Sequence, residues 1–399
     1  MKKLMMAAGL LLMMGMPMMA INAAQADHPK KSTTLPIAGE VVKADNPLIQ
    51  YVGRVSMAKP GIASFNYPGT TIQARFQGTS LKMICRPMTG YFMAQVDGCE
   101  PFKVGFNAER DSVVTVAAAL PKGEHDVKMM YVIEGLFRTP EFHGFVLDKG
   151  CRLVEAPALP ERKIEFIGNS ITCGYGVESI EMTDPFEDET ENHWLTYANI
   201  VSDSLHAQHT SISRSGIGVY RNYNGPKTGD AENMPWQYEY TLFNKHTEKW
   251  DFAKSQPQLV CINLGTNDLS TNNYDISLYE KNYRMFLKTV RSKYPTAKIV
   301  LLTGPMLGEK ESSEQRAVLD RICADANKAG FTLASNTIVD KEGRVKSVKK
   351  PVGDKNVYRF DFTFQTGDLG YGASWHPSKL QHQKMAGELL PFLKKLMNW

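Results

Sequence analysis

Hydrophobic and polar residues alternate over short runs in the first third of the chain, and this pattern predicts an all-β domain over residues 44–150. The runs are rich in β-branched and aromatic residues, and turn-forming pairs such as Asp97-Gly98 separate them. Short strands at this spacing are typical of a β-sandwich or jelly roll. The predicted strands cover residues 71–76, 80–85, 91–96, 112–117, 126–132 and 142–146.

The pattern changes after residues 151–163, which contain Pro157 and Pro160 and are predicted to be a linker. In residues 164–399, apolar runs alternate with segments whose apolar residues recur three and four positions apart, the period of a helix. This alternation predicts an α/β domain with a parallel sheet covered on both faces. The predicted strands are 164–167, 210–213, 259–264, 298–303 and 332–339, and the clearest helices lie within 279–290 and 385–396.

The first 26 residues have the pattern of a secretory signal peptide. Lys2 and Lys3 give a positive start, an apolar run follows, and Ala24-Gln25-Ala26 fits a small-residue cleavage site. We therefore expect an exported chain, periplasmic or secreted, with no membrane attachment once residues 1–26 are removed. Disulfides are permitted there, and Cys85 and Cys99 are near enough in sequence to bridge two strands, although spacing does not fix the pairing.

The charge balance argues against a nucleic-acid partner. The formal charge is +4 at pH 7, and removal of Lys2 and Lys3 leaves 44 basic against 42 acidic residues, so no basic surface for nucleic acid is expected. The chain has no CxxC pair and no HExxH motif, and His206 and His209 are expected at the surface rather than on a metal. No metal and no cofactor are predicted.

Four polar or glycine-rich segments mark the expected site in the α/β domain. Three follow predicted strands, and the fourth precedes the last helix. Because the carboxyl ends of parallel strands meet at one edge of a sheet, where open α/β folds bind ligands, we expect the four to surround one crevice. They are Gly168-Asn169-Ser170, residues 213–218 (Ser-Arg-Ser-Gly-Ile-Gly), residues 264–268 (Leu-Gly-Thr-Asn-Asp) and residues 374–377 (Ser-Trp-His-Pro).

These segments carry the residue types that acyl transfer needs. A serine hydroxyl is a weak nucleophile unless a histidine takes its proton, and His376 is the histidine in these loops. A tetrahedral intermediate needs donors aimed at its oxyanion, which a serine amide, a glycine amide and an asparagine side chain would supply. The G-x-S-x-G elbow of the α/β-hydrolases is absent from the chain, so a different fold carries this chemistry.

Taken in order, the four segments resemble the blocks of the SGNH (GDSL-like) hydrolase superfamily. More narrowly, residues 170–176 (Ser-Ile-Thr-Cys-Gly-Tyr-Gly), 219–223 (Val-Tyr-Arg-Asn-Tyr) and 262–268 (Ile-Asn-Leu-Gly-Thr-Asn-Asp) resemble the family 2 carbohydrate esterases. That family places a jelly roll before its hydrolase domain, so the resemblance covers nearly all of the mature chain. It implies a flavodoxin-like SGNH hydrolase domain, with a parallel sheet, over residues 164–399.

Carried over residue by residue, the resemblance implies that Ser170 is the nucleophile and His376 the general base. The oxyanion hole would be formed by the main-chain N–H groups of Ser170 and Gly216 and by the side chain of Asn267. Gly218, in the same loop as Gly216, is the alternative glycine.

One departure concerns the group that orients the histidine. The superfamily usually has an aspartate two or three residues before it, where this chain has Ser374 and Ala373. Such an acid holds the tautomer of the imidazole and stabilises its cation. Some members of the esterase family lack the acid and use a main-chain carbonyl. We therefore expect a Ser-His dyad oriented either by a main-chain carbonyl or by the more distant Asp368.

Aromatic residues in or beside these loops are candidates to bind a sugar ring. They are Trp375, Tyr220 and Trp236, each with core packing as the alternative, and Trp375 is favoured because it adjoins the base. Asn222 and Tyr223 follow the oxyanion loop and are candidates to shape an acyl pocket. Two further polar residues are expected to be structural, Asp268 by bracing its loop and Cys173 because no base flanks it.

The leading interpretation is an exported serine esterase that removes O-acetyl groups from polysaccharides or oligosaccharides. The resemblance implies xylan- or glucomannan-like substrates, of the kind that acetylxylan esterases deacetylate. Two alternatives stay open: an SGNH lysophospholipase or thioesterase, and a carbohydrate-binding protein without activity. Against the first, the loops lack a long apolar run to line an acyl-chain groove; against the second, Ser170, Asn267 and His376 are all present.

Overall fold

The computed structural model describes residues 37–109, 112–271, 273–328, 337–339, 345–347 and 354–399. The predicted signal peptide, residues 1–26, lies outside these ranges. Residues 38–399 form one compact unit, and none of its described helices is both long and apolar enough to cross a lipid bilayer.

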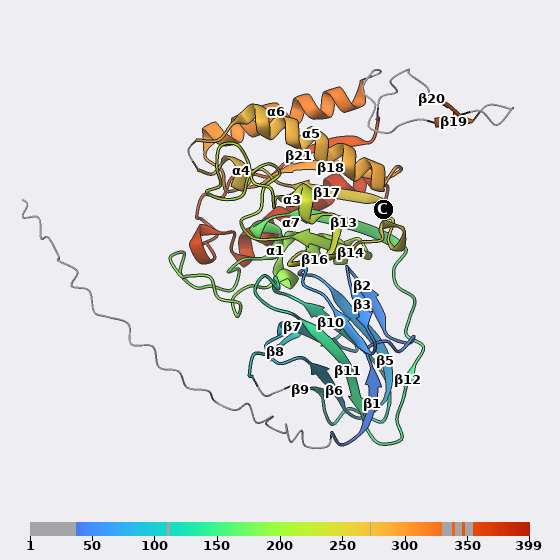
Figure 1. Ribbon diagram of the computed structural model, residues 1–399. Coiled ribbons are helices and arrows are strands. Elements are labelled where there is room, and N and C mark those ends of the chain that lie inside the picture. Colours follow the sequence, from blue (N-terminus) through green and yellow to red (C-terminus); the bar gives the residue numbers. More distant parts are fainter. Residues whose placement is uncertain (1–36, 110–111, 272, 329–336, 340–344, 348–353) are drawn as a thin grey trace, which may run out of the picture. The chain divides into compact units, whose positions relative to one another are not determined.

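The N-terminal part is an all-β domain of two antiparallel sheets, which confirms the predicted fold class (Figure 1). One sheet has the order β3-β4-β11-β6-β9, with β1 beside β11, and the other has the order β12-β5-β10-β7-β8, with β2 beside β5. Buried aromatic rings such as Phe65, Phe92 and Tyr131 pack edge to face in its core. The strands are β1 (Glu40–Lys43), β2 (Gln50–Val52), β3 (Ser56–Lys59), β4 (Ile62–Ser64), β5 (Thr71–Gly78), β6 (Leu81–Cys85), β7 (Gly90–Val96), β8 (Phe102–Phe106), β9 (Val113–Ala117), β10 (Gly123–Tyr131), β11 (Glu141–Leu147) and β12 (Leu153–Val154).

The C-terminal part is an α/β domain built on a five-stranded parallel sheet of order β14-β13-β17-β18-β21. Numbered along the chain this is the 2-1-3-4-5 order of flavodoxin-like folds, whose ligand crevice opens at the carboxyl ends of the first and third strands. The strands are β13 (Arg162–Gly168), β14 (Ala207–Ser213), β17 (Leu259–Asn263), β18 (Lys298–Thr303) and β21 (Val357–Asp361).

Helices cover both faces of this sheet, as the periodicity predicted. Alternate strand residues divide between two cores, with Ile167 and Ile262 in one and Phe166 and Cys261 in the other. The first core is closed by α5 and α6, which are labelled in Figure 1, and the second by α2 and α7. The helices are α1 (Ser170–Cys173), α2 (Tyr197–Ser204), α3 (Met234–Gln237), α4 (Thr266–Leu269), α5 (Ile276–Lys293), α6 (Glu309–Asn327) and α7 (Lys379–Met397), with short turns η1 (His193–Leu195), η2 (Phe252–Lys254) and η3 (Ala373–Trp375).

Two sequence expectations about strands need correction. The run 332–339 was expected in the parallel sheet, but the described part of it is β19 (Thr337–Val339), which pairs antiparallel with β20 (Val345–Ser347). The fifth parallel strand is β21, whose half-buried residues at the sheet edge lack a continuous apolar run. The predicted linker also contributes to the sheets, since it contains β12 and the first two residues of β13.

The two domains are joined through Arg54, a fully buried residue of the β domain. Its Nη1 donates to the carbonyl oxygens of Tyr238 and Tyr240, at 2.5 and 2.8 Å. Its guanidinium carbon lies 5.0 Å from the ring centre of Tyr238 and 5.4 Å from that of Trp250. A hairpin of the α/β domain, β15 (Tyr240–Leu242) with β16 (Lys245–Lys249), is thereby held against the β domain.

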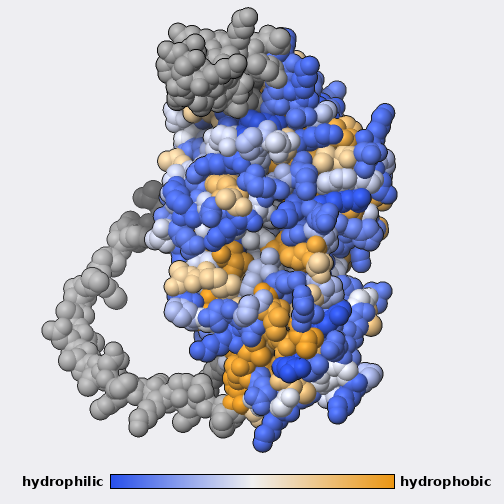
Figure 2. Space-filling view, turned by 90° about the vertical axis from the view of Figure 1, so that its right-hand side faces the viewer, coloured by the Kyte–Doolittle hydropathy of each residue, from blue (hydrophilic) through white to orange (hydrophobic). Residues whose placement is uncertain are grey.

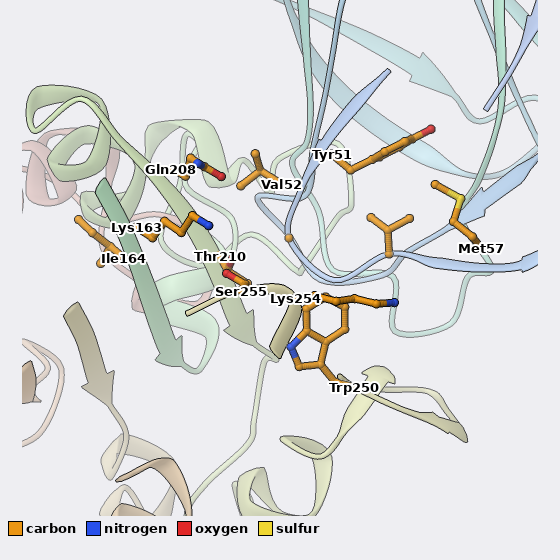
Figure 3. Close-up of a pocket in the computed structure, with 12 residues that line it drawn as sticks. Tyr51, Val52, Met57, Lys163, Ile164, Gln208, Thr210, Trp250, Lys254 and Ser255 are labelled. Atoms are coloured by element: carbon orange, nitrogen blue, oxygen red, sulfur yellow. The ribbon is translucent and has the colours of Figure 1, made fainter. Parts of the chain in front are cut away.

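A pocket of about 230 Å³ opens beside this junction (Figure 3). Tyr51 and Val52 line it from the β domain, and Lys163, Ile164 and Trp250 from the α/β domain. Because Lys163 and Ile164 are the second and third residues of β13, the pocket lies near the amino end of this strand, whereas Ser170 follows its carboxyl end. On the face seen in Figure 2, hydrophobic side chains gather over the β domain, whereas the α/β domain is mostly hydrophilic.

Candidate active site

Ser170 occupies the turn between β13 and α1. The turn is tight, because a Cβ at Gly168 would lie 2.1 Å from Thr172 Oγ1. Asn169 caps α1 by accepting the Ile171 N–H at 3.1 Å, which leaves the Ser170 N–H at the open first turn of the helix. In register, Gly168 pairs with Ser213 of β14 and with Asn263 of β17. Ser170 therefore sits between the loops that follow β14 and β17.

The structure brings His376 to Ser170, as predicted. His376 Nε2 lies 2.8 Å from Ser170 Oγ, although 206 residues separate the two in the chain. His376 Nδ1 faces the main-chain oxygens of Ala373 and Ser374, at 3.0 and 3.2 Å. Because carbonyl oxygens only accept, Nδ1 carries the proton and Nε2 is free to accept the serine hydroxyl.

A main-chain carbonyl thus orients the histidine, and the alternative of Asp368 is wrong in this structure. Asp368 is exposed, and its carboxylate accepts the Thr366 hydroxyl at 2.8 Å. Among the described residues, no carboxylate lies within ion-pair distance of His376.

The loop carrying His376 is locked onto the turn that follows Ser170. The Ala373 N–H donates to Gly176 O at 3.0 Å, and a Cβ at Gly176 would lie 2.3 Å from Ala373 Cβ. Ser374 and Trp375 both adopt left-handed φ angles, of 51° and 59°, which cost about 1–3 kcal/mol each. Such strain persists only where the surroundings impose it, and here it presents the imidazole to Ser170.

Tyr175 supports the imidazole from the side. Its ring stacks on His376 with centres 4.1 Å apart and planes 26° apart, and Phe186 packs on Tyr175 at 4.6 Å. Burial lowers the pKa of His376 to about 4, against the opposing pull of the Ala373 and Ser374 carbonyls. The imidazole is therefore neutral at neutral pH. Tyr175 belongs to the segment 170–176 that resembles the esterase family, but nothing in the sequence indicated that its ring would stack on His376.

The candidate oxyanion donors lie at the same edge of the sheet. Gly216 has a φ of +74°, and a Cβ placed there would meet only Tyr223 Cβ, at 4.0 Å, so the space beside this residue is open. Asn267 Nδ2 donates one hydrogen to Ile217 O at 2.8 Å and keeps a second. Gly218 is committed elsewhere, because its N–H donates to Asn222 Oδ1 at 3.2 Å. The geometry thus favours Gly216 over Gly218.

Asp268 braces the loop beside the candidate oxyanion donors, as expected from the sequence. Its fully buried carboxylate accepts the N–H groups of Val219, Tyr220 and Arg221, with Oδ1 at 2.9, 2.8 and 3.3 Å. Burial raises the pKa of Asp268 to about 6, although these N–H contacts pull it down. The residue acts through the loop and contacts neither Ser170 nor His376.

The aromatic candidates have different surroundings. The prediction for Tyr220 is wrong, because its ring is 2% exposed in the core and its hydroxyl accepts the Asp275 N–H at 2.9 Å. Trp236, on α3, is partly exposed and packs on His246, with ring centres 3.7 Å apart. Trp375 is 52% exposed and Tyr223, beside Gly216, is 56% exposed. These two remain available to a ligand.

A buried carboxylate cluster under the site was missed from the sequence. Glu134, Cys173 and Glu191 bring one oxygen or sulfur atom each within 4.8 Å of the others. Their positions are too far apart in the chain to form a motif. The expectation for His209 was also wrong: it is buried, and its Nε2 lies 3.0 Å from His193 Nε2. All six cysteines are free thiols.

Two family models match the chain. Residues 51–157 match the model described as carbohydrate esterase 2 N-terminal, and residues 164–389 match GDSL-like Lipase/Acylhydrolase.

Three relatives illustrate the similarity. Cellulase/esterase CelE of Acetivibrio thermocellus is 34% identical to this chain. The match covers 89% of this chain but only 40% of the length of CelE. An acetylxylan esterase / glucomannan deacetylase of Cellvibrio japonicus is 27% identical over 90% of this chain and 91% of its own. The solved structure of a family two carbohydrate esterase from Clostridium thermocellum, in complex with cellohexaose, is 32% identical with a TM-score of 0.76. That match covers 88% of this chain and 99% of the other.

Proposed function

The chain belongs to the family 2 carbohydrate esterases and is a carboxylic ester hydrolase, and we propose that it removes O-acetyl groups from xylan- or glucomannan-like polysaccharides or oligosaccharides. The relatives named acetylxylan esterase / glucomannan deacetylase support this substrate class. We further propose that the enzyme is exported, periplasmic or secreted, on the strength of the signal-peptide pattern in residues 1–26.

The proposed mechanism uses Ser170 and His376 as a dyad. Ser170 Oγ attacks the acetyl carbonyl carbon while His376 Nε2 takes the hydroxyl proton. The oxyanion that forms accepts from the N–H groups of Ser170 and Gly216 and from Asn267 Nδ2. As the tetrahedral intermediate collapses, the bond to the sugar oxygen breaks and His376 returns its proton to that oxygen. Water, activated by the same histidine, then releases acetate from the acyl-serine.

One observation carries the proposal: the 2.8 Å contact between His376 Nε2 and Ser170 Oγ, with Nδ1 bound to main-chain carbonyl oxygens. That arrangement places an unprotonated nitrogen on the serine hydroxyl. The pKa of about 4 keeps the imidazole in its proton-accepting form at neutral pH.

The test is acetate release from acetylated xylan and acetylated glucomannan by the mature protein and by Ser170→Ala. We expect release by the wild type and a loss of at least about a thousandfold in the variant. Ser202→Ala is the matched control, because Ser202 is also buried but its hydroxyl bonds only Ala198 O within α2. Acetate release by Ser170→Ala at the wild-type rate would overturn the dyad. Wild-type cleavage of aryl acetates without release from either polysaccharide would overturn the substrate class.

A further inference from the structure

A carboxylate of the β domain reaches the loop that supplies the proposed oxyanion donor. Glu134 lies three residues beyond the end of β10 and is 4% exposed. Its Oε2 accepts the N–H of Ser215 at 2.6 Å and lies 3.8 Å from the thiol sulfur of Cys173. Ser215 directly precedes Gly216, and Cys173 ends α1, the helix that begins with Ser170. One carboxylate therefore contacts both the loop of Gly216 and the helix that begins with Ser170.

Glu134 and Tyr223 together clamp the peptide groups around Gly216. The Ser215 N–H is bound by Glu134, and Gly216 O accepts the Tyr223 N–H at 2.8 Å. A glycine with positive φ has no Cβ to limit rotation of its flanking peptides. The Ser215 N–H belongs to the peptide between Arg214 and Ser215, and Gly216 O to the peptide between Gly216 and Ile217. The two hydrogen bonds therefore hold the peptides on either side of the one that carries the Gly216 N–H, and they limit its rotation.

Glu134 is itself held in place by the α/β domain. Its own N–H donates to Glu191 Oε2 at 2.9 Å. On either side of it, the His193 N–H donates to Val132 O at 2.9 Å and Asn244 Nδ2 donates to Gly135 O at 3.0 Å. The segment 132–135 is thus a fixed part of the domain junction. This allows the Glu134 side chain to position the loop that contains Gly216.

We propose that Glu134 is a positioning residue for the deacetylation reaction, by which the β domain holds the Gly216 N–H toward the oxyanion. The inference rests on the proposed function. It gives the β domain a role in catalysis beyond packing. A resident metal ion in the same cluster is the competing explanation. The contacts favour positioning, because Glu134 Oε2 already receives donors from Ser215 and Cys173, and a cation at that oxygen would face both.

The experiment compares kcat and KM on an acetylated xylo-oligosaccharide, together with the rate at which an aryl phosphonate modifies Ser170. Phosphonylation, like acyl transfer, builds negative charge on an oxygen in the oxyanion hole. For Glu134→Ala we expect kcat and the phosphonylation rate to fall together by roughly ten- to a hundredfold, with KM changed less than about threefold. Glu134→Gln keeps an acceptor oxygen for Ser215, so its kcat should stay within about threefold of wild type.

The matched control is Glu141→Ala. Glu141 is also a glutamate of the β domain with 5% exposure, but it binds Lys59 at 2.6 Å and contacts none of the catalytic loops. Its removal should leave kcat unchanged. If Glu134→Ala does not fold, Glu134→Asp replaces it, since the shorter side chain withdraws the carboxylate from Ser215 and should lower kcat in the same way.

The outcomes separate this inference from the proposed function. An unchanged kcat in Glu134→Ala, with Ser170→Ala inactive, would overturn the positioning role alone. A defect confined to KM would also overturn it, because misplacing an oxyanion donor acts on the transition state. If the wild type lost its activity on dialysis against EDTA, a metal ion in the cluster would explain the role of Glu134, and the positioning role would be rejected. Full activity of Ser170→Ala would instead reject the dyad on which the inference stands.

Discussion

The two sides of the candidate active site are held in place by different chemistry. The base side, residues 372–376 with Tyr175 stacked on the imidazole, is fixed by main-chain hydrogen bonds and ring packing. The oxyanion side, residues 215–221, is fixed by two buried carboxylates, Glu134 and Asp268, which accept its main-chain N–H groups.

The difference follows from what each side must present. In the proposed mechanism, the oxyanion side must point certain N–H groups outward. Its carboxylates bind neighbouring N–H groups that would otherwise be buried without partners. The base side must present an unprotonated nitrogen. A carbonyl at Nδ1 fixes the tautomer without the strong rise in pKa that a carboxylate would cause. Charge is therefore used where it anchors main-chain donors and avoided beside the base.

The largest expected effect is on the stability of the oxyanion side. Asp268→Ala removes the acceptor for the N–H groups of Val219, Tyr220 and Arg221 in a fully buried site. Unsatisfied buried donors cost about 1–3 kcal/mol each, so we expect the free energy of unfolding to fall by about 3–5 kcal/mol. Urea denaturation measures this.

Asp148→Ala is the control for that change. Asp148 also accepts two main-chain N–H groups, from Thr79 and Ser80, but at a half-exposed turn of the β domain. Water can replace it there, so a loss of only about 1 kcal/mol is expected. If the free energy of unfolding of Asp268→Ala lay within about 1 kcal/mol of the wild-type value, the claim that carboxylates anchor the oxyanion side would be wrong.

The second effect is on catalysis, from the base side. Gly176→Ala would bring a Cβ to 2.3 Å from Ala373 Cβ and push residues 372–376 away from the turn after Ser170. Because a misplacement of about 1 Å can cost a hundredfold, we expect kcat to fall by about that factor. Gly98→Ala is the control, since Gly98 has a similar φ of +68° and a methyl group added there would meet no atom within 4 Å. Equal kcat values in the two variants would show that the Gly176 contact does not position His376.

Much of this site could be predicted because its parts are short and local in sequence. Ser170, Asn267 and His376 each occur in a tight cluster of polar and glycine residues beside a strand or helix, and strand order then brings them together. The β domain and the α/β alternation were equally visible, since both depend on periodicity.

The supporting residues were not predictable for the opposite reason. Glu134 reaches the site from the other domain, and its hydrogen bond to Ser215 spans 81 positions. The residues around Tyr220 in the sequence do not show whether its ring is buried or exposed. In the structure the ring lies in the core. The strand β21 lies at the sheet edge, where half-buried residues weaken the apolar signal. These features depend on tertiary packing rather than local pattern.

The smallest of the three effects is on the pH profile, and it tests the base side directly. His376 must be neutral to accept the Ser170 proton, so kcat/KM falls as the pH drops through its pKa. With a pKa of about 4, the acid limb of the profile should have its midpoint near pH 4. At pH 5, the neutral fraction of His376 should be roughly thirtyfold larger than that of a histidine titrating at about 6.5.

Ser374→Asp supplies a carboxylate two residues before His376, where the superfamily usually has one, and should move the midpoint upward by about one unit or more. Hydrolysis of an aryl acetate between pH 3.5 and 8 measures both profiles, with recovery of activity at pH 7 as the control for unfolding. A wild-type midpoint at about 6.5 or above would mean that the carbonyl-bound imidazole is no weaker a base than an exposed one, and the contrast between the two sides would lose its functional meaning.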